Sequence, residues 1–223
     1  MSRTLVLIHG LGRTAQSMAP IEREGNRLGM HAVRVSYPSR RAPIAALAAL
    51  VGAQLAAEDG PFDVVTHSMG GVLLRAAVAY GYLDASRIRR AVMLAPPNQG
   101  SELADWLRRR WYYRLATGPA GQELGTRPGE SIPITLPPVA FAVGVIAGTR
   151  SLNPLSPLIF SEANDGKVAL SRAQVDGMAD FLAVRRPHST LMRAPEVVAA
   201  TFAFLECGRF GLDSPDTTTV HRT

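Results

Sequence analysis

Short apolar segments alternate with longer amphipathic segments along the chain. The short segments are rich in Val, Ile and Leu, whereas the longer ones space their apolar residues as one face of a helix does. This alternation predicts β–α units that build a parallel sheet. Six strands are predicted, at residues 5–8, 31–37, 62–66, 91–95, 141–147 and 181–184. We therefore expect an α/β fold, doubly wound around a mostly parallel six-stranded sheet.

The helical segments complete the expected domain. They lie at residues 15–28, 42–57, 70–80 and 195–206. The stretch 42–57 is the longest Ala/Leu-rich segment, but it is shorter than the roughly 20 apolar residues that a membrane span requires. After residue 208 the chain becomes polar, with too little apolar surface to offset the entropy of ordering. We expect one domain over residues 1–208 and a disordered tail at 209–223.

The composition suits this single domain. The chain has 223 residues, of which 47% are hydrophobic and 19% charged, so it can bury a core without disulfides or metals. Cys207 is the only cysteine, and no intramolecular disulfide can form, as is usual in a reducing compartment. Residues 1–8 lack the features of an export signal. We therefore expect a cytoplasmic protein.

The net charge of +6 and the pI near 10.2 raise the question of an anionic partner. Arginine supplies almost all of the positive charge, Lys167 being the only lysine, and the arginines are scattered along the chain. Scattering indicates a compositional bias more than a surface for phosphate backbones. We expect no nucleic-acid partner and no stable membrane insertion. The competing hypothesis, a basic module for membranes or nucleic acids, predicts binding that falls steeply with salt.

Ser68 lies at the junction of a predicted strand and a predicted helix. The buried strand at 62–66 leads into it, and the helix at 70–80 follows. A serine on such a sharp turn is held in strained backbone geometry, with its hydroxyl at the carboxyl edge of the sheet. The helix N-terminus directs free N–H groups and a positive dipole end to the same point. Ser68 is therefore the candidate nucleophile.

The residues around Ser68 carry a resemblance to a known family. Residues 66–71, Thr-His-Ser-Met-Gly-Gly, resemble the nucleophile elbow of α/β-hydrolases, in particular of small bacterial lipases and esterases. Thr66 departs from the family pattern, which usually has glycine there. Upstream, residues 9–12 are His-Gly-Leu-Gly, similar to the start of the family's oxyanion loop. The resemblance implies a minimal α/β-hydrolase fold whose oxyanion donors are the backbone N–H groups of Leu11 and Met69.

His188 is the candidate general base. It follows the last predicted strand and precedes the final helix, where the family keeps its catalytic histidine. The alternative is an ordinary histidine of a surface loop. The other histidines are placed less suitably. His9 belongs to the oxyanion loop, and His31 begins a strand. His67 is expected to point away from Ser68, and His221 lies in the tail.

Asp165 is the candidate acid. The family order is serine, acid, histidine, and residues 164–168, Asn-Asp-Gly-Lys-Val, follow the penultimate strand and are similar to the family's acid loop. An Asp-Gly turn is common in itself. Three other carboxylates stay as alternatives: Glu162, Asp176 and Asp180.

Residues 98–138 interrupt the alternation after the third-from-last strand. Insertions of this length are usually functional, and this one leaves the sheet on the carboxyl side, so we expect a cap or lid over Ser68. Its aromatic residues include Trp106, which we expect to contact an acyl chain or a lipid surface, or else to pack inward as in an ordinary helix. His9 and Tyr37 are further candidate substrate-binding residues, Tyr37 because it ends a strand beside the oxyanion loop.

These residue types predict a serine esterase or lipase. Ser68 would attack an acyl carbonyl, His188 would move its proton, and Asp165 would orient the imidazole. The expected partner is a small-molecule or lipid ester, with transient contact to a lipid surface. A thioesterase or a phospholipid acyl hydrolase would use the same residues, and a non-catalytic binding protein of the same fold is the alternative of another class. The sequence contains no metal cluster or cofactor motif, so we expect neither a metal nor a cofactor.

Overall fold

Six parallel strands form the centre of the molecule. The computed structural model describes residues 3–211 and 217–219. The strands run in the spatial order β2-β1-β3-β4-β5-β6, followed by the short antiparallel β7. Their bounds are β1 Thr4–Ile8, β2 His31–Val35, β3 Phe62–His67, β4 Ile88–Leu94, β5 Val143–Gly148, β6 Asp180–Val184 and β7 Thr217–Thr219. The prediction of a doubly wound, mostly parallel six-stranded sheet is confirmed, and β7 is an addition to it.

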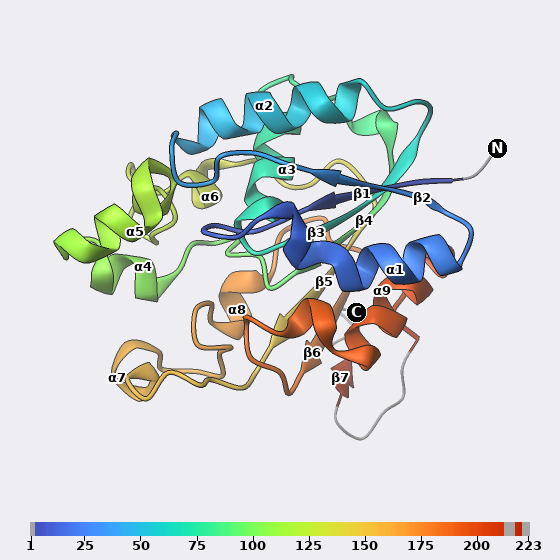
Figure 1. The fold of residues 1–223 in the computed structure, drawn as a ribbon. Coiled ribbons are helices and arrows are strands. Elements are labelled where there is room, and N and C mark those ends of the chain that lie inside the picture. The colour runs from blue at the N-terminus through green and yellow to red at the C-terminus, as the bar shows by residue number, and fades with distance from the viewer. Residues whose placement is uncertain (1–2, 212–216, 220–223) are drawn as a thin grey trace.

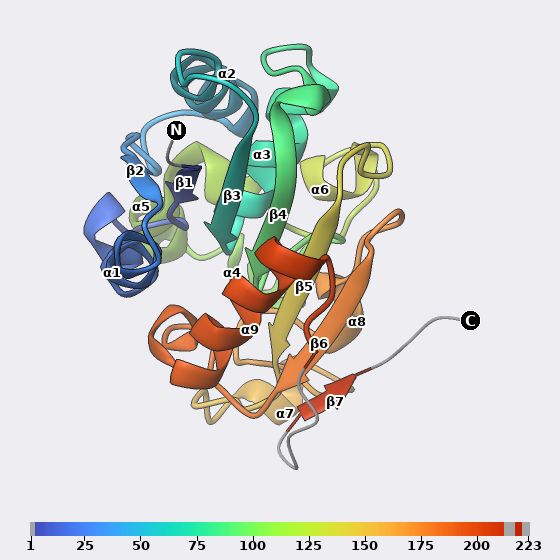
Figure 2. The same cartoon turned by 90° about the vertical axis from the view of Figure 1, so that its right-hand side faces the viewer.

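Helices cover both faces of the sheet (Figures 1 and 2). On one face, α2 (Ile44–Ala56) and α3 (Met69–Ala79) pack on Val6 and Ile8 of β1, and on the other α1 (Ala19–Arg27) and α9 (Pro195–Cys207) pack on Leu5 and Leu7. Successive strand residues point to opposite faces, so these four apolar residues of β1 serve both cores. This is why the strands of a covered parallel sheet are continuously apolar.

In the part of the chain that the structure describes, three short 3₁₀ helices complete the scaffold, at Ala15–Met18, Ala85–Arg87 and Leu191–Arg193. The first of them opens the helix expected at 15–28, so that the α-helical part begins only at Ala19. Gly29, with φ of 77°, follows the end of this helix, because glycine adopts the left-handed conformation without strain.

The inserted segment forms three helices at the carboxyl ends of the strands, at the left of Figure 1. They are α4 (Glu102–Leu107), α5 (Trp111–Gln122) and α6 (Ile132–Thr135), all between β4 and β5. Within α5, Gly118 has φ of 63° and Pro119 follows it, so the helix is kinked there. Two further short helices, α7 (Ser156–Ile159) and α8 (Leu170–Ala173), join β5 to β6. None of the helices in the described residues is long and apolar enough to span a membrane.

The folded part of the chain extends beyond residue 208. Phe210 is fully buried against Phe204, with ring centroids 5.0 Å apart, and its N–H donates to Asp180. Thr217–Thr219 pairs with β6. These two contacts were not expected of a disordered tail at 209–223, whose residues 212–216 and 220–223 lie outside the described residues.

Candidate active site

Ser68 occupies a strained turn between β3 and α3. Its φ of 54° and ψ of −126° lie in a region that non-glycine residues rarely adopt. Two glycines make the turn fit. A Cβ on Gly10 would lie 2.9 Å from the Ser68 Cβ, and one on Gly70 would lie 2.7 Å from the carbonyl oxygens of Ile8 and His9. The loop of residues 9–12 and helix α3 can therefore approach each other only because both positions are glycine.

Thr66 is accommodated by the helix opposite it. Its side chain is fully buried, and a Cβ on Gly71 would lie 3.2 Å from the Thr66 Oγ1. The second glycine of α3 leaves room for a threonine where the family usually has glycine. The departure at Thr66 therefore leaves the turn intact.

Two hydrogen bonds connect Ser68, His188 and Asp165. The Ser68 Oγ lies 2.9 Å from the His188 Nε2, and the His188 Nδ1 lies 2.8 Å from the Asp165 Oδ2. Because a carboxylate only accepts hydrogen bonds, Nδ1 carries the hydrogen and Nε2 is free to accept from the serine hydroxyl. His188 and Asp165 are both buried, so little water competes for these bonds.

The loop that carries Asp165 fixes its carboxylate. The second carboxylate oxygen, Oδ1, accepts from the backbone N–H groups of Lys167 and Val168, each at 2.9 Å. The backbone of Asp165 also accepts from the His188 N–H at 3.0 Å. Gly166, with φ of 94°, makes the turn that these bonds require. The loops of Asp165 and His188 are thus joined by a side-chain and a backbone hydrogen bond.

The three alternative carboxylates lie in other environments. Glu162 is exposed and bonds to Ser171, and Asp180 accepts from the N–H groups of Phe181 and Phe210. Asp176 lines a separate cavity beneath α6. The structure thus brings Asp165, and none of these three, to His188.

The loop of residues 9–12 is held in place by residues that follow β2. The Tyr37 hydroxyl donates to the His9 carbonyl at 2.5 Å, the two rings stack at 4.2 Å, and the Ser39 Oγ accepts from the Gly12 N–H at 3.1 Å. Leu11 lines the cavity beside Ser68, and Met69 is the first residue of α3, where helix N–H groups have no partner within the helix.

A cavity of about 380 Å³ opens in front of Ser68. One wall is apolar and comes largely from the inserted helices, whose contributing residues are Leu103, Ala104, Leu107, Tyr113, Ala116 and Leu124. The lining also includes Gly12, Arg13 and Lys167. The candidate substrate-binding residues His9, Tyr37 and Trp106 are not in the lining: the first two are buried behind the loop, and Trp106 is 43% exposed on α4.

His67 is a site residue that the sequence argument set aside. It lines the cavity, its ring lies 5.0 Å from that of His188, and its Nε2 donates to the His188 carbonyl at 3.0 Å. Burial, and then the nearby His188, lower the pKa of His67 well below its usual value. A neutral His67 thus braces the loop of the candidate base. The alternation of side chains along β3 predicts that His67 points away from Ser68, whereas both residues line the same cavity.

Ser101 is a second residue without a signal in the sequence. Its Oγ donates to the Lys167 carbonyl at 2.6 Å, and it is the N-cap of α4, where it accepts from the Ala104 N–H. It therefore ties the first inserted helix to the loop of Asp165. Across the described residues, no group of three or more His, Cys, Asp or Glu side chains is arranged to hold a metal ion.

The sequence alone matches no protein-family model and no curated protein. The structure does have similar solved structures. The mature lipase BlEst2 of Bacillus licheniformis aligns with a TM-score of 0.70 at 16% identity, over 93% of this chain and 92% of that one. The metagenomic carboxyl esterase MGS0156 aligns at 0.64 and 20% identity, over 85% and 65%. The phospholipase PlaB of Legionella pneumophila aligns at 0.61 and 15% identity, over 93% and 57%.

These neighbours identify the fold. The strand order, the position of Ser68 after β3 and the similarity to lipases and esterases show that the chain has the α/β-hydrolase fold. At these identities the likeness concerns the fold alone.

Proposed function

We propose that the protein is a serine hydrolase that cleaves carboxylic esters through an acyl-enzyme on Ser68. The observation that carries the proposal is the pair of short hydrogen bonds from Ser68 to His188 and from His188 to Asp165. A serine hydroxyl at its ordinary pKa is a weak nucleophile and needs an adjacent base, itself oriented by a third group. The three side chains fulfil these three roles.

The proposed reaction has two halves. The His188 Nε2 accepts the hydroxyl proton as the Ser68 Oγ attacks the ester carbonyl, and the imidazolium then donates that proton to the departing alcohol. Water, deprotonated by the same nitrogen, hydrolyses the acyl-enzyme and restores the serine. Asp165 stays ionised throughout, keeps the hydrogen on Nδ1 and stabilises the transient imidazolium.

The backbone N–H groups of Leu11 and Met69 are the proposed donors to the oxyanion. Met69 begins α3, so the positive end of the helix dipole also faces this point. Removing one such donor typically lowers kcat by about 100- to 1,000-fold. Gly10 and Gly70 serve this geometry, because they allow loop and helix to approach.

The apolar wall of the cavity suits an acyl chain. Leu107, Tyr113 and Leu124 come from the inserted segment, which we propose acts as a cap over the acyl site. Thioesters and phospholipids present the same carbonyl chemistry. The exposed Trp111, 75%, and Leu115, 77%, on α5 provide an apolar surface beside this site for transient contact with a lipid interface.

A chain-length series of nitrophenyl esters tests the proposal. We expect hydrolysis by the native chain, with kcat lowered by about 10⁴- to 10⁶-fold in Ser68→Ala. The exposed serine variant Ser161→Ala is the matched control and should retain native activity. A fluorophosphonate should label Ser68 alone. Labelling of another serine, or substantial activity in Ser68→Ala, would show that the nucleophile has been misassigned.

A further inference from the structure

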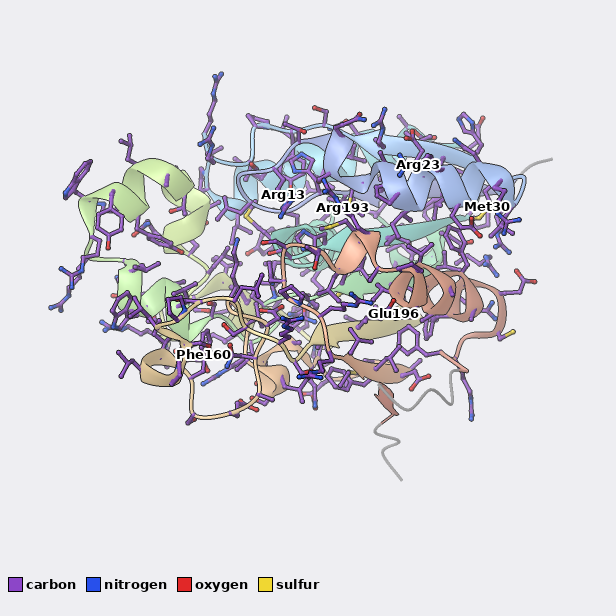
Figure 3. All side chains as sticks on the ribbon, turned by 60° about the horizontal axis from the view of Figure 1, so that its bottom comes forward. Arg13, Arg23, Met30, Phe160, Arg193 and Glu196 are labelled. Atoms are coloured by element: carbon purple, nitrogen blue, oxygen red, sulfur yellow. The ribbon has the colours of Figure 1, made fainter. Side chains whose placement is uncertain are left out.

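Cationic side chains gather on one side of the cavity mouth. Arg13 follows the oxyanion loop and Lys167 belongs to the loop of Asp165, and both line the same cavity as Ser68. Arg193 lies next to Arg13 (Figure 3), close enough to lower its pKa by charge repulsion. The only lysine of the chain thus stands at the candidate active site.

Ion pairs neutralise part of the positive charge of the described residues, but not the charge of these three cations. Eight arginines form ion pairs with carboxylates: Arg3, Arg27, Arg34, Arg89, Arg108, Arg127, Arg172 and Arg186. Within residues 3–211 and 217–219, neither Arg13, Lys167 nor Arg193 does so. The hydrogen bond of the Arg13 guanidinium goes to a neutral acceptor, the Ser189 carbonyl, at 3.1 Å.

The described lining of the cavity contains no Asp or Glu to balance this charge. The nearby Asp165 acts electrostatically on Lys167, but its carboxylate oxygens bond to His188 and to backbone N–H groups and not to the Lys167 ammonium. Desolvation, and then the charge of Arg13, lower the pKa of Lys167. Desolvation and Arg193 likewise lower that of Arg13. Arg13 is half-buried and Lys167 and Arg193 are exposed, and like charges held together at a cavity favour the binding of an anion.

We propose that Arg13 and Lys167, backed by Arg193, form an anion-binding subsite of the active site. It selects esters whose alcohol part carries a phosphate or carboxylate group. This inference rests on the proposed function for the position of the scissile carbonyl. The lining also includes apolar residues of the inserted segment, among them Leu107 and Leu124, which suit the acyl chain, so we assign the anion to the leaving alcohol.

Ligand binding tests the subsite without requiring turnover. Calorimetry on the native chain should give tighter binding of hexyl phosphate than of its neutral dimethyl ester, by a factor that shrinks with salt. Lys167→Gln and Arg13→Gln should each lower the affinity for hexyl phosphate by about fivefold and leave the affinity for the neutral ester nearly unchanged. Lys167→Arg should retain the preference. The backbone groups of Lys167 that bond Asp165 and Ser101 are preserved in each variant.

The matched control is Arg23→Gln, which removes one charge from an exposed position on α1, away from Arg13 in Figure 3. It should bind hexyl phosphate as the native chain does. Equal affinities of the native chain for the two hexyl compounds would overturn the subsite. Equal losses of affinity for hexyl phosphate in Arg23→Gln and Lys167→Gln would also overturn it.

Turnover separates this inference from the proposed function. The ratio of kcat/KM for a hexanoyl ester of 4-hydroxybenzenesulfonate to that for the matched sulfonamide should fall about fivefold in Lys167→Gln. Hydrolysis of both esters with an unchanged ratio refutes the subsite alone, whereas hydrolysis of neither refutes the proposed function and leaves calorimetry to decide the subsite. Comparing monomeric short-chain phosphatidic acid with phosphatidylcholine shows whether a lipid headgroup supplies the anion.

Discussion

At the scale of single residues, the site combines a strained backbone at Ser68 with hydrogen bonds that hold it in place. The backbone of Ser68 is in a region whose occupation costs of the order of 1–3 kcal/mol. The turn persists because its N–H bonds to Leu94 of β4 and its carbonyl to Gly71 of α3. The Ser68 hydroxyl is thereby held at a fixed point. His188 and Asp165 lie beside it on two loops that are hydrogen-bonded to each other.

Asp165→Asn tests the orienting role. The amide can still accept from the N–H groups of Lys167 and Val168, so the fold should be retained, but it cannot hold the hydrogen on the His188 Nδ1 as a carboxylate does. We expect kcat to fall by about 10²- to 10⁴-fold, less than in Ser68→Ala, in nitrophenyl ester assays. Asp176→Asn, outside this cavity, is the control. A silent Asp165→Asn would remove Asp165 from the mechanism.

The sequence is informative where a residue's role follows from its position in an element. Ser68 is predicted by a strand, a turn and a helix, all of which are local. Asp165 needed a resemblance, because nothing local distinguishes its turn from others. Tyr37 was expected in the pocket since it ends a strand at the right edge, but its contacts with His9 depend on how two neighbouring strand ends pack, which a sequence pattern does not specify.

At the scale of elements, the inserted segment is attached to α3 by one buried arginine. The Nη1 of Arg75 donates to the Asn98 carbonyl at 2.9 Å, and Nη2 donates to the Leu136 carbonyl at 3.1 Å and to that of Pro137 at 3.2 Å. These acceptors lie at the two ends of the insertion. Burial lowers the pKa of Arg75 to about 10, so the guanidinium is still charged at neutral pH. Helix α3 thus fixes both ends of the inserted segment.

Arg75→Met should release the insertion. It leaves several buried carbonyls without donors, so we expect a loss of about 2–4 kcal/mol in the free energy of unfolding. Proteolysis of the native state should then cut first within residues 98–138. Arg114 is an exposed arginine of α5, so Arg114→Met removes the same charge but should change neither the free energy of unfolding nor the site of proteolysis. Native resistance to proteolysis in Arg75→Met would mean that α3 does not hold the cap.

Elements differ in how much of them the sequence reveals. The six parallel strands were predictable because each is a short apolar run bounded by polar or turn residues, although their ends shift by a few positions. The three-residue strand β7 lies in a polar tail and gains its place only by pairing with β6. Arg75 was equally hidden, since an arginine in an apolar helix has no special spacing and its five acceptors come from distant segments.

At the scale of the whole molecule, two buried histidines couple stability to pH. Burial lowers the pKa of His9 and, more strongly, that of His67, which also faces His188, Arg13 and Lys167. Above the unfolded value near 6.5 both states are neutral and stability is unaffected. Below it the unfolded chain binds protons that the folded chain does not bind, so stability falls as the pH falls. For His67 the loss is about 1.4 kcal/mol per pH unit until its folded-state pKa is reached.

Urea unfolding at pH 7.5 and pH 5.0 measures this coupling. His67→Gln keeps a donor for the His188 carbonyl but cannot titrate, so its loss of stability between the two pH values should be smaller than that of the native chain by about 2 kcal/mol. His31→Gln alters an exposed histidine and should keep the native dependence. If His67→Gln lost as much stability as the native chain on acidification, then His67 would accept its proton inside the folded protein, and the lowered pKa argued from its burial would be wrong.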